Sequence, residues 1–111
     1  MITRIWHGRT LTEHAAIYRQ YVIDTGIPDY LATPGNLGAQ IWQRTEGNIT
    51  HIWTVSWWAT YDDIKAFAED EIEKARYYEE DKQYLLEFEP QVMHYDTYDF
   101  RPTDYYKPYQ S

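Results

Sequence analysis

The sequence predicts an α+β domain in which four strands and two helices follow in the order β-α-β-β-α-β. Residues 49–58 alternate bulky and small side chains and are rich in β-branched and aromatic types, which is typical of a strand. Directly afterwards the period changes, and Thr60 and Asp63 have the spacing of a helix capping box. The chain has 111 residues and no internal repeat, which fits one domain. A strand that runs into an amphipathic helix is half of a split β-α-β unit.

The alternation within 49–58 separates two rows of side chains that point to opposite faces. One row consists of Ile49, His51, Trp53, Val55 and Trp57. The other row consists of Thr50, Ile52, Thr54, Ser56 and Trp58. Neither row carries a formal charge, so we expect both faces to be covered and this strand to be central.

The first strand is predicted over residues 2–9. Its alternation places Ile5 and His7 on one face and Arg4 and Trp6 on the other. We expect the row of His7 to face the helices.

The first helix is predicted between a start signal and a stop signal. Thr10 and Glu13 have capping-box spacing. Gly26, followed by Pro28, ends the helix because Gly accepts the left-handed cap and Pro cannot continue the helix. The apolar stripe between them is Leu11, Ala15, Tyr18 and Val22. Residues 27–38 are then predicted to be a loop, with a tight turn at Pro34-Gly35-Asn36.

The second half of the chain is predicted to complete the sheet. The elements are a strand over 39–45, a hairpin connection over 46–48, a helix from residue 60 to 76 or 77, a segment over 77–83 that is irregular or a short turn of helix, and a strand over 91–98. The predicted helix has an apolar face formed by Ile64, Phe67, Ala68, Ile72 and Ala75.

This order predicts a ferredoxin-like fold, a four-stranded antiparallel sheet with both helices on one face. The other face would be bare, and the sequence supplies few polar residues to solvate it. We therefore expect a homodimer packed through the open sheet faces, which is a dimeric α/β barrel.

Composition excludes several classes of function. The net charge is −8, with 10 basic and 18 acidic residues, so phosphate backbones and anionic lipids should be repelled. No nucleic-acid or membrane partner is expected. The chain has no cysteine, which removes disulfides and thiolate sites, and no apolar run reaches the roughly 20 residues that span a bilayer. We expect a cytoplasmic protein.

Four segments resemble the antibiotic biosynthesis monooxygenase-like domains of the dimeric α/β-barrel superfamily. They are Ile5-Trp6-His7-Gly8-Arg9, the loop 33–38 (Thr-Pro-Gly-Asn-Leu-Gly), Trp58 before the capped helix, and Ala75-Arg76-Tyr77-Tyr78. On this resemblance, residues 1–98 form the domain and residues 99–111 form a Tyr- and Pro-rich C-terminal tail.

The superfamily includes cofactor-free oxygenases of phenolic polyketides, haem-degrading enzymes, and polyketide cyclases and isomerases. In the haem branch, a helix Trp, a helix His and a strand Asn contact haem. In this chain, the position of the Trp is Phe67, that of the His is Tyr77, and that of the Asn is His7 or Gly8, so none of the three residues matches. Tyr can ligate ferric haem, but the branch is weakened and no cofactor is predicted. The same Asn and helix Trp serve some cofactor-free oxygenases, so that implication also loses support.

The resemblance implies a pocket for a small aromatic molecule and oxygenase chemistry that begins with proton removal. His7 is the candidate base, and Tyr77 or Arg76 would hold the oxyanion. The deprotonated phenol would then reduce O₂ directly. The candidate substrate-binding residues are Trp58, Phe67, Tyr78 and His94.

Other interpretations remain open. The same proton chemistry would serve a non-redox cyclase or isomerase, and a non-catalytic ligand-binding or structural dimer needs none of it. His7, His51 and His94 would form a metal site only if all three shared one face. Separate hydrogen-bonded histidines are favoured over that site, and no metal is predicted.

Overall fold

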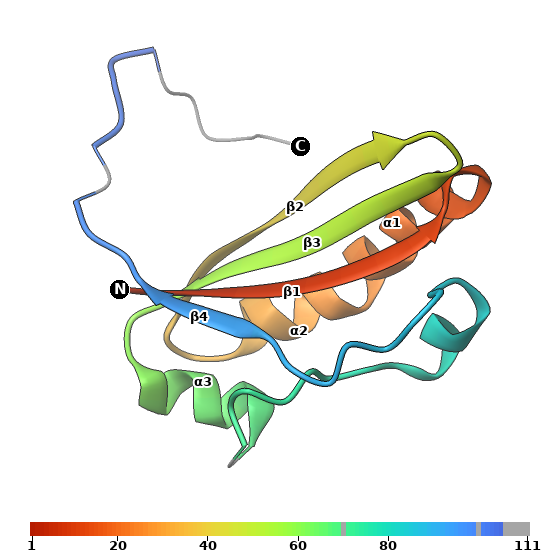
Figure 1. The fold of residues 1–111 in the computed structure, drawn as a ribbon. Helices are drawn as coiled ribbons and strands as arrows, with labels where there is room; N and C mark the ends of the chain where they lie inside the picture. The colour runs from red at the N-terminus through yellow and green to blue at the C-terminus, as the bar shows by residue number, and fades with distance from the viewer. Residues whose placement is uncertain (70, 100, 106–111) are drawn as a thin grey trace.

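The computed structural model describes residues 1–69, 71–99 and 101–105. Its strands form one antiparallel sheet in the order β2-β3-β1-β4 (Figure 1). The strands are β1 (Ile2–Leu11), β2 (Asn36–Glu46), β3 (Ile49–Trp58) and β4 (Met93–Asp96). The helices are α1 (Ala15–Asp24), α2 (Gly26–Ala32) and α3 (Tyr61–Ala68), with short 3₁₀ helices η1 (Thr12–His14) and η2 (Glu79–Gln83). The α+β class is confirmed, and the open sheet is compatible with a ferredoxin-like fold.

β3 is the central strand, with the bounds that the alternation predicted. It pairs along its whole length with β1, from Ile2↔Trp58 to Leu11↔Ile49. On its other side it pairs with β2, to which a tight turn at Gly47 and Asn48 joins it. Gly47 has a φ of 63°, a conformation that glycine adopts without strain.

One face of the sheet is covered by the helices, and Figure 1 shows α1 and α2 running along it. The β1 row on this face is Ile2, Arg4, Trp6, Gly8 and Thr10, all buried. The β3 row beside it is Thr50, Ile52, Thr54, Ser56 and Trp58, also buried. Two clusters form the core: Trp6 and Ile52 pack with α1, while Ile2 and Trp58 pack with α2 and α3. Burial of these rows provides the main driving force for folding.

The predicted start of the first helix is wrong. Thr10 belongs to β1, and its hydroxyl donates to the Tyr84 carbonyl at 2.9 Å instead of capping a helix. α1 begins at Ala15 without a side-chain cap. α1 ends at Asp24, close to the predicted stop, but Gly26 does not form the predicted left-handed cap, because it is the first residue of α2 and has no positive φ. The predicted loop 27–38 is largely wrong, because α2 covers its first half. Pro28 is compatible with α2 since it lies in the first turn, where backbone N–H groups have no intrahelical partner.

The second predicted helix is too long. Its cap is confirmed, because the Asp63 N–H donates to the Thr60 hydroxyl at 3.2 Å, but α3 ends at Ala68. Glu69 follows with a φ of 65°, which leaves the helical region. Residues 74 and 75 instead pair with the segment before β4: Lys74 lies opposite Gln91, and the Ala75 N–H donates to the Pro90 carbonyl at 2.9 Å. Arg76, Tyr77 and Tyr78 therefore do not end a helix.

The remaining boundaries differ by a few residues. β1 and β2 are longer than predicted and β4 is shorter than 91–98. In the segment 77–83, η2 is the short helical turn that was one of the two predicted alternatives. Of the predicted tail 99–111, residue 100 and residues 106–111 lie outside the described residues, and 101–105 are exposed.

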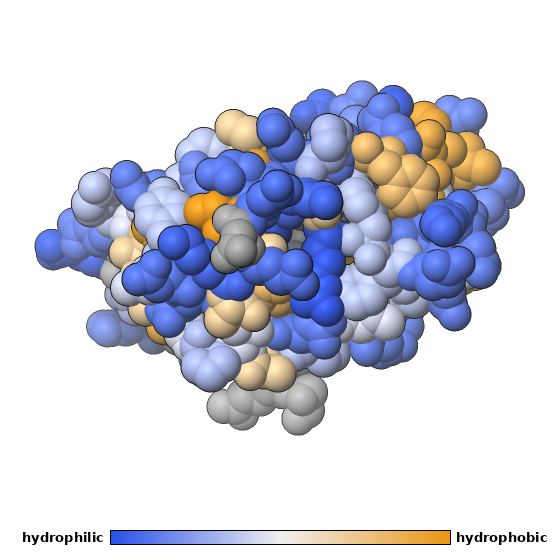
Figure 2. Space-filling view, turned by 90° about the horizontal axis from the view of Figure 1, so that it is seen from below, coloured by the Kyte–Doolittle hydropathy of each residue, from blue (hydrophilic) through white to orange (hydrophobic). Residues whose placement is uncertain are grey.

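The two surfaces of the molecule differ in character. The surface on the side of α3 and residues 77–92 is mostly hydrophilic, interrupted by one larger hydrophobic patch (Figure 2). On the open face of the sheet, Trp42, Met93 and Tyr95 are 45%, 58% and 49% exposed. No helix among the described residues is long and apolar enough to cross a membrane.

Candidate functional site

His7 lies on the open face of the sheet, so the expectation that its row faces the helices is wrong. Trp6 and Gly8 point towards the helices, and strand alternation directs His7 the opposite way. A period of two separates the rows but does not indicate which of them the helices cover. The larger indole of Trp6 takes the covered side, where it leaves no room for a Cβ at Gly8.

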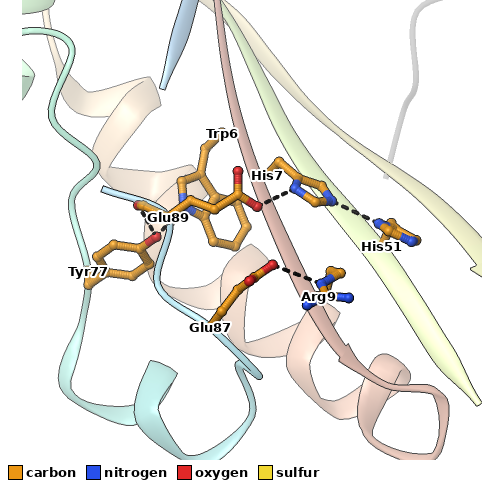
Figure 3. A network of polar contacts seen from close by, with 7 residues as sticks. All are labelled: Trp6, His7, Arg9, His51, Tyr77, Glu87 and Glu89. Atoms are coloured by element: carbon orange, nitrogen blue, oxygen red, sulfur yellow. Dashed lines mark hydrogen bonds and ion pairs between the residues drawn. The ribbon is translucent and has the colours of Figure 1, made fainter. Parts of the chain in front are cut away.

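A carboxylate and two imidazoles form a polar chain on this open face (Figure 3). Glu89 contacts Nδ1 of His7. Nε2 of His7 is 2.9 Å from Nδ1 of His51, and the two rings stack with an interplanar angle of 18°. His7 and Glu89 are both partly exposed, so a molecule on this face could reach them.

The hydrogen-bond network assigns the protons along this chain. An ionised Glu89 only accepts, so His7 carries its proton on Nδ1 and donates it to the carboxylate. Nε2 of His7 is then an acceptor, and His51 donates to it from Nδ1. A carboxylate that fixes the imidazole tautomer leaves the other ring nitrogen free to take a proton.

Secondary structure and one tyrosine hold the chain in place. His7 is paired across the sheet with Trp53, and their ring centroids are 5.1 Å apart. Glu89 precedes β4, and its carbonyl accepts from the Tyr77 hydroxyl at 2.5 Å. The same hydroxyl accepts from the Trp6 indole N–H at 3.3 Å. Tyr77 therefore positions Glu89 and does not face His7 itself.

His7, Trp53 and Glu89 border an open-face hollow of about 380 Å³. Its walls are mostly aromatic and apolar, with an imidazole and a carboxylate, those of His7 and Glu89, among them. The lining residues are Ile5, His7, Trp42, Trp53, Glu89, Gln91, Met93 and Tyr95. This volume is in the range of small-molecule sites, which combine apolar walls with a few directing polar groups.

The other predicted site residues lie on the helix-covered side. Arg76 and Tyr78 line a smaller inner cavity of about 40 Å³ between the sheet and the helices. Phe67 lies 5.0 Å from the Arg76 guanidinium and packs against the fully buried Trp58. His94 accepts from a guanidinium nitrogen of Arg4 at 3.1 Å, since arginine can only donate.

The predicted catalytic set is therefore divided by the sheet. His7 is on the open face, whereas Arg76 is on the covered side, where its guanidinium is 3.7 Å from Asp29. Burial raises the pKa of Tyr77, although its bond from Trp6 opposes the increase. Burial and then the bond to Asp29 raise the pKa of Tyr78. Both phenols stay protonated near neutral pH and act as hydrogen-bond donors.

The three histidines do not converge. His94 is on the covered face, opposite His7 and His51. Among the described residues, no group of three or more His, Asp or Glu side chains could hold a metal ion.

Sequence reasoning missed Glu89 and Arg4, and it considered His51 only as a metal ligand. Arg4 carried a readable signal, because it alternates with Ile2 and Trp6 in a row that is otherwise apolar or neutral. Glu89 carried none, since its place beside His7 depends on a long-range contact.

Comparison with known proteins adds no assignment to this geometry. No protein-family model matches the chain, and no curated protein matches it. The chemistry of the site therefore has to be argued from its own residues.

Proposed function

We propose that the protein binds a small aromatic molecule in the open-face hollow and removes a proton from it, with His7 as the base. The observation that supports this most directly is the carboxylate–imidazole pair of Glu89 and His7 at the wall of an aromatic hollow. A base of this type is effective near neutral pH because the pKa of an imidazole lies close to it.

The reaction begins when a substrate hydroxyl takes the place of His51 as the donor to Nε2 of His7. The proton moves from the substrate oxygen to Nε2, which leaves a phenolate and an imidazolium. Glu89, bonded to Nδ1, stabilises that imidazolium without taking the proton itself. Trp53, whose ring is tilted by 36° against that of His7, provides a flat surface for the substrate ring.

The fate of the anion distinguishes the reaction classes. In the oxygenase that the family resemblance implies, O₂ enters with the substrate, and a ring carbon of the phenolate gives two electrons to O₂ as it bonds to one oxygen atom. The proton on Nε2 of His7 goes to the outer oxygen, which forms a hydroperoxide, and loss of water with the hydrogen of that ring carbon leaves a quinone. In a cyclase or isomerase, the proton returns to a different atom and no O₂ is consumed. Arg76 takes no part on this face, and Tyr77 acts by positioning Glu89.

A second copy of the chain is the proposed cover for the open face. Trp42, Met93 and Tyr95 are large, apolar or aromatic, and about half exposed, which is typical of an interface. Packing two sheets face to face would bury these side chains and enclose the hollow.

Met93→Glu should shift the wild-type dimer towards monomer in analytical ultracentrifugation, while far-UV circular dichroism is retained. A monomeric wild-type protein would rule out this assembly.

The catalytic proposal is tested with a panel of bicyclic and tricyclic phenols. O₂ uptake is followed with an electrode, and carbon-bound hydrogen exchange is followed by NMR in D₂O. His7→Gln should lower turnover at least about 100-fold, the usual contribution of a positioned base. The matched control is His14→Gln, a histidine in η1, away from the hollow.

The outcomes separate the alternatives. Turnover with O₂ uptake supports an oxygenase, and exchange without O₂ uptake supports a cyclase or isomerase. Binding of phenols without turnover or exchange contradicts catalysis and leaves a ligand-binding protein. Equal activities of His7→Gln and His14→Gln would exclude His7 as the base.

A further inference from the structure

Arg4 is a buried cation on the covered face of the sheet. Its side chain is only 2% exposed. None of the ion pairs between described residues includes it. Burial of a guanidinium is unfavourable unless hydrogen bonds and an opposite charge compensate it.

The hydrogen bonds of Arg4 occupy one side of the guanidinium. Nη1 donates to the Ile72 carbonyl at 2.5 Å and to Nε2 of His94 at 3.1 Å. Nη2 makes one long bond, to the Lys74 carbonyl at 3.3 Å. Nε is buried and has no hydrogen-bond partner among the described residues. The Nε–H and the second hydrogen of Nη2 lie side by side, and together they match the two oxygens of a carboxylate.

This guanidinium lines the inner cavity, together with polar groups from four other elements. Thr54 and Tyr30 contribute hydroxyls that are 3.2 Å apart. Arg76 also lines the cavity and is half-exposed, so its side of the cavity is nearest to solvent. The cavity therefore contains two cations in a protein whose net charge is −8.

One carboxylate, Asp81, shares the cavity, but its oxygens are already engaged. It accepts from the Tyr18 hydroxyl at 2.9 Å and from the Tyr78 N–H at 2.6 Å. No ion pair joins it to Arg4 or Arg76 among the described residues. Its bonds keep it at the end of the cavity formed by Tyr18 and Tyr78, so it does not neutralise Arg4.

We propose that the inner cavity is a binding site for the carboxylate of a small organic acid, held by the Nε–Nη2 edge of Arg4. A volume of about 40 Å³ admits a carboxylate but not an aromatic ring. The body of the ligand must therefore extend past Arg76 towards solvent. Burial lowers the pKa of Arg4, and Tyr30 and Glu73 only partly oppose that decrease, without an ion pair to Glu73 among the described residues. Binding would place an opposite charge directly against Arg4 and would supply an acceptor for its unpartnered Nε–H. This site lies on the other face of the sheet from His7, so the two proposals stand or fall separately.

The test compares benzoate with benzamide, which has nearly the same shape and no charge. Both are titrated into the wild-type protein at constant chloride concentration. The arginine Nε–H signals are followed by ¹H–¹⁵N NMR, and the melting temperature is followed by calorimetry. Benzoate should shift one protected Nε–H signal downfield and raise the melting temperature with concentration, whereas benzamide should do neither. Sodium sulfate at matched ionic strength separates carboxylate recognition from a general anion effect.

Two variants assign the site. Arg4→Lys keeps the charge but removes the two-pronged donor edge, and it should weaken benzoate binding at least about tenfold. Because Arg4 is buried, this variant can fail to fold, so Arg76→Gln provides a second test at a half-exposed position. It should also weaken binding, while His14→Gln, in η1 and outside both cavities, should leave benzoate affinity at the wild-type value. Equal responses to benzoate and benzamide, an equal response to sulfate, or unchanged affinity in Arg76→Gln would overturn the proposal.

Discussion

Both faces of the sheet carry tryptophan side chains, but in different environments. On the covered face, Trp6 and Trp58 are buried under helices and form the two core clusters. On the open face, Trp42 and Trp53 remain partly accessible and border a hollow with titratable groups. The same residue type therefore stabilises the fold on one face and lines an accessible hollow on the other.

The charged side chains of the two faces also differ in their exposure to solvent. The covered face buries Arg4 and Asp81, each held by hydrogen bonds that secure its geometry. On the open face, Glu89 contacts His7, and both stay within reach of solvent. Burial of an ion is energetically unfavourable and hinders its titration, whereas a partly exposed imidazole can exchange protons with solvent. This difference is why we propose acid–base chemistry for the open face and anion recognition for the covered one.

The largest expected effect comes from truncating one tryptophan on each face. Trp58 is 0% exposed and packs against Tyr30 and Phe67. Trp58→Ala should lower the free energy of unfolding by about 3–5 kcal/mol, because the cavity cannot collapse fully. Trp42→Ala, at a 45% exposed position, should change it by only about 0.5 kcal/mol in the monomer.

Urea denaturation at low protein concentration measures both values. Equal losses for the two variants would contradict the assignment of the faces. If the open face is an interface, Trp42→Ala should instead weaken self-association, which sedimentation detects.

Much of the sheet could be predicted from the sequence because strand signals are local. β3 has its predicted bounds, since ten consecutive residues share one alternating pattern and Gly47 marks the turn before them. The helices were harder to predict. Ile64, Phe67 and Ala75 are buried as the periodicity implied, yet α3 ends at Ala68, because residues 73–75 pair with the segment before β4. That pairing is a long-range contact, which local patterns do not encode.

The site could be predicted only in part for the same reason. His7 was identified from its residue type and strand position, but alternation alone does not indicate which face it occupies. Its partner Glu89 is distant in the sequence, and Arg76 was placed with His7 because the helix was extended too far. Pairings between elements determine the site, and a single sequence does not contain them.

A smaller effect is expected from removing one hydroxyl on each face. The hydroxyl of Tyr18 donates to buried Asp81 at 2.9 Å. Tyr18→Phe should cost about 1–3 kcal/mol of unfolding free energy, because a buried carboxylate oxygen loses its donor. Tyr95→Phe, on the open face, should stay within about 0.5 kcal/mol of the wild type. The same denaturation assay applies, and a Tyr95→Phe loss as large as that of Tyr18→Phe would contradict the contrast between the faces.

The pH dependence of the Tyr18→Phe difference gives a second check. Burial raises the pKa of Asp81, and the bond from Tyr18 opposes that increase. Removing the bond raises the pKa further, so the variant is penalised only where Asp81 is ionised. The difference from the wild type should be present at neutral pH and should shrink as the pH falls through the pKa of folded Asp81.

The smallest expected effect concerns His94, whose pKa is lowered by burial and then by the neighbouring Arg4, while Glu73 opposes the decrease. Folding therefore favours the neutral imidazole. Above the unfolded pKa of about 6.5, both states are neutral and stability is unaffected; below it, the unfolded state binds the proton more readily and stability falls. In His94→Gln, an amide oxygen can still accept from Arg4, so the loss of stability between pH 7 and pH 5 should be smaller than in the wild type. Denaturation curves at the two pH values measure this, and an unchanged loss would mean that Arg4 tolerates a charged neighbour on the covered face.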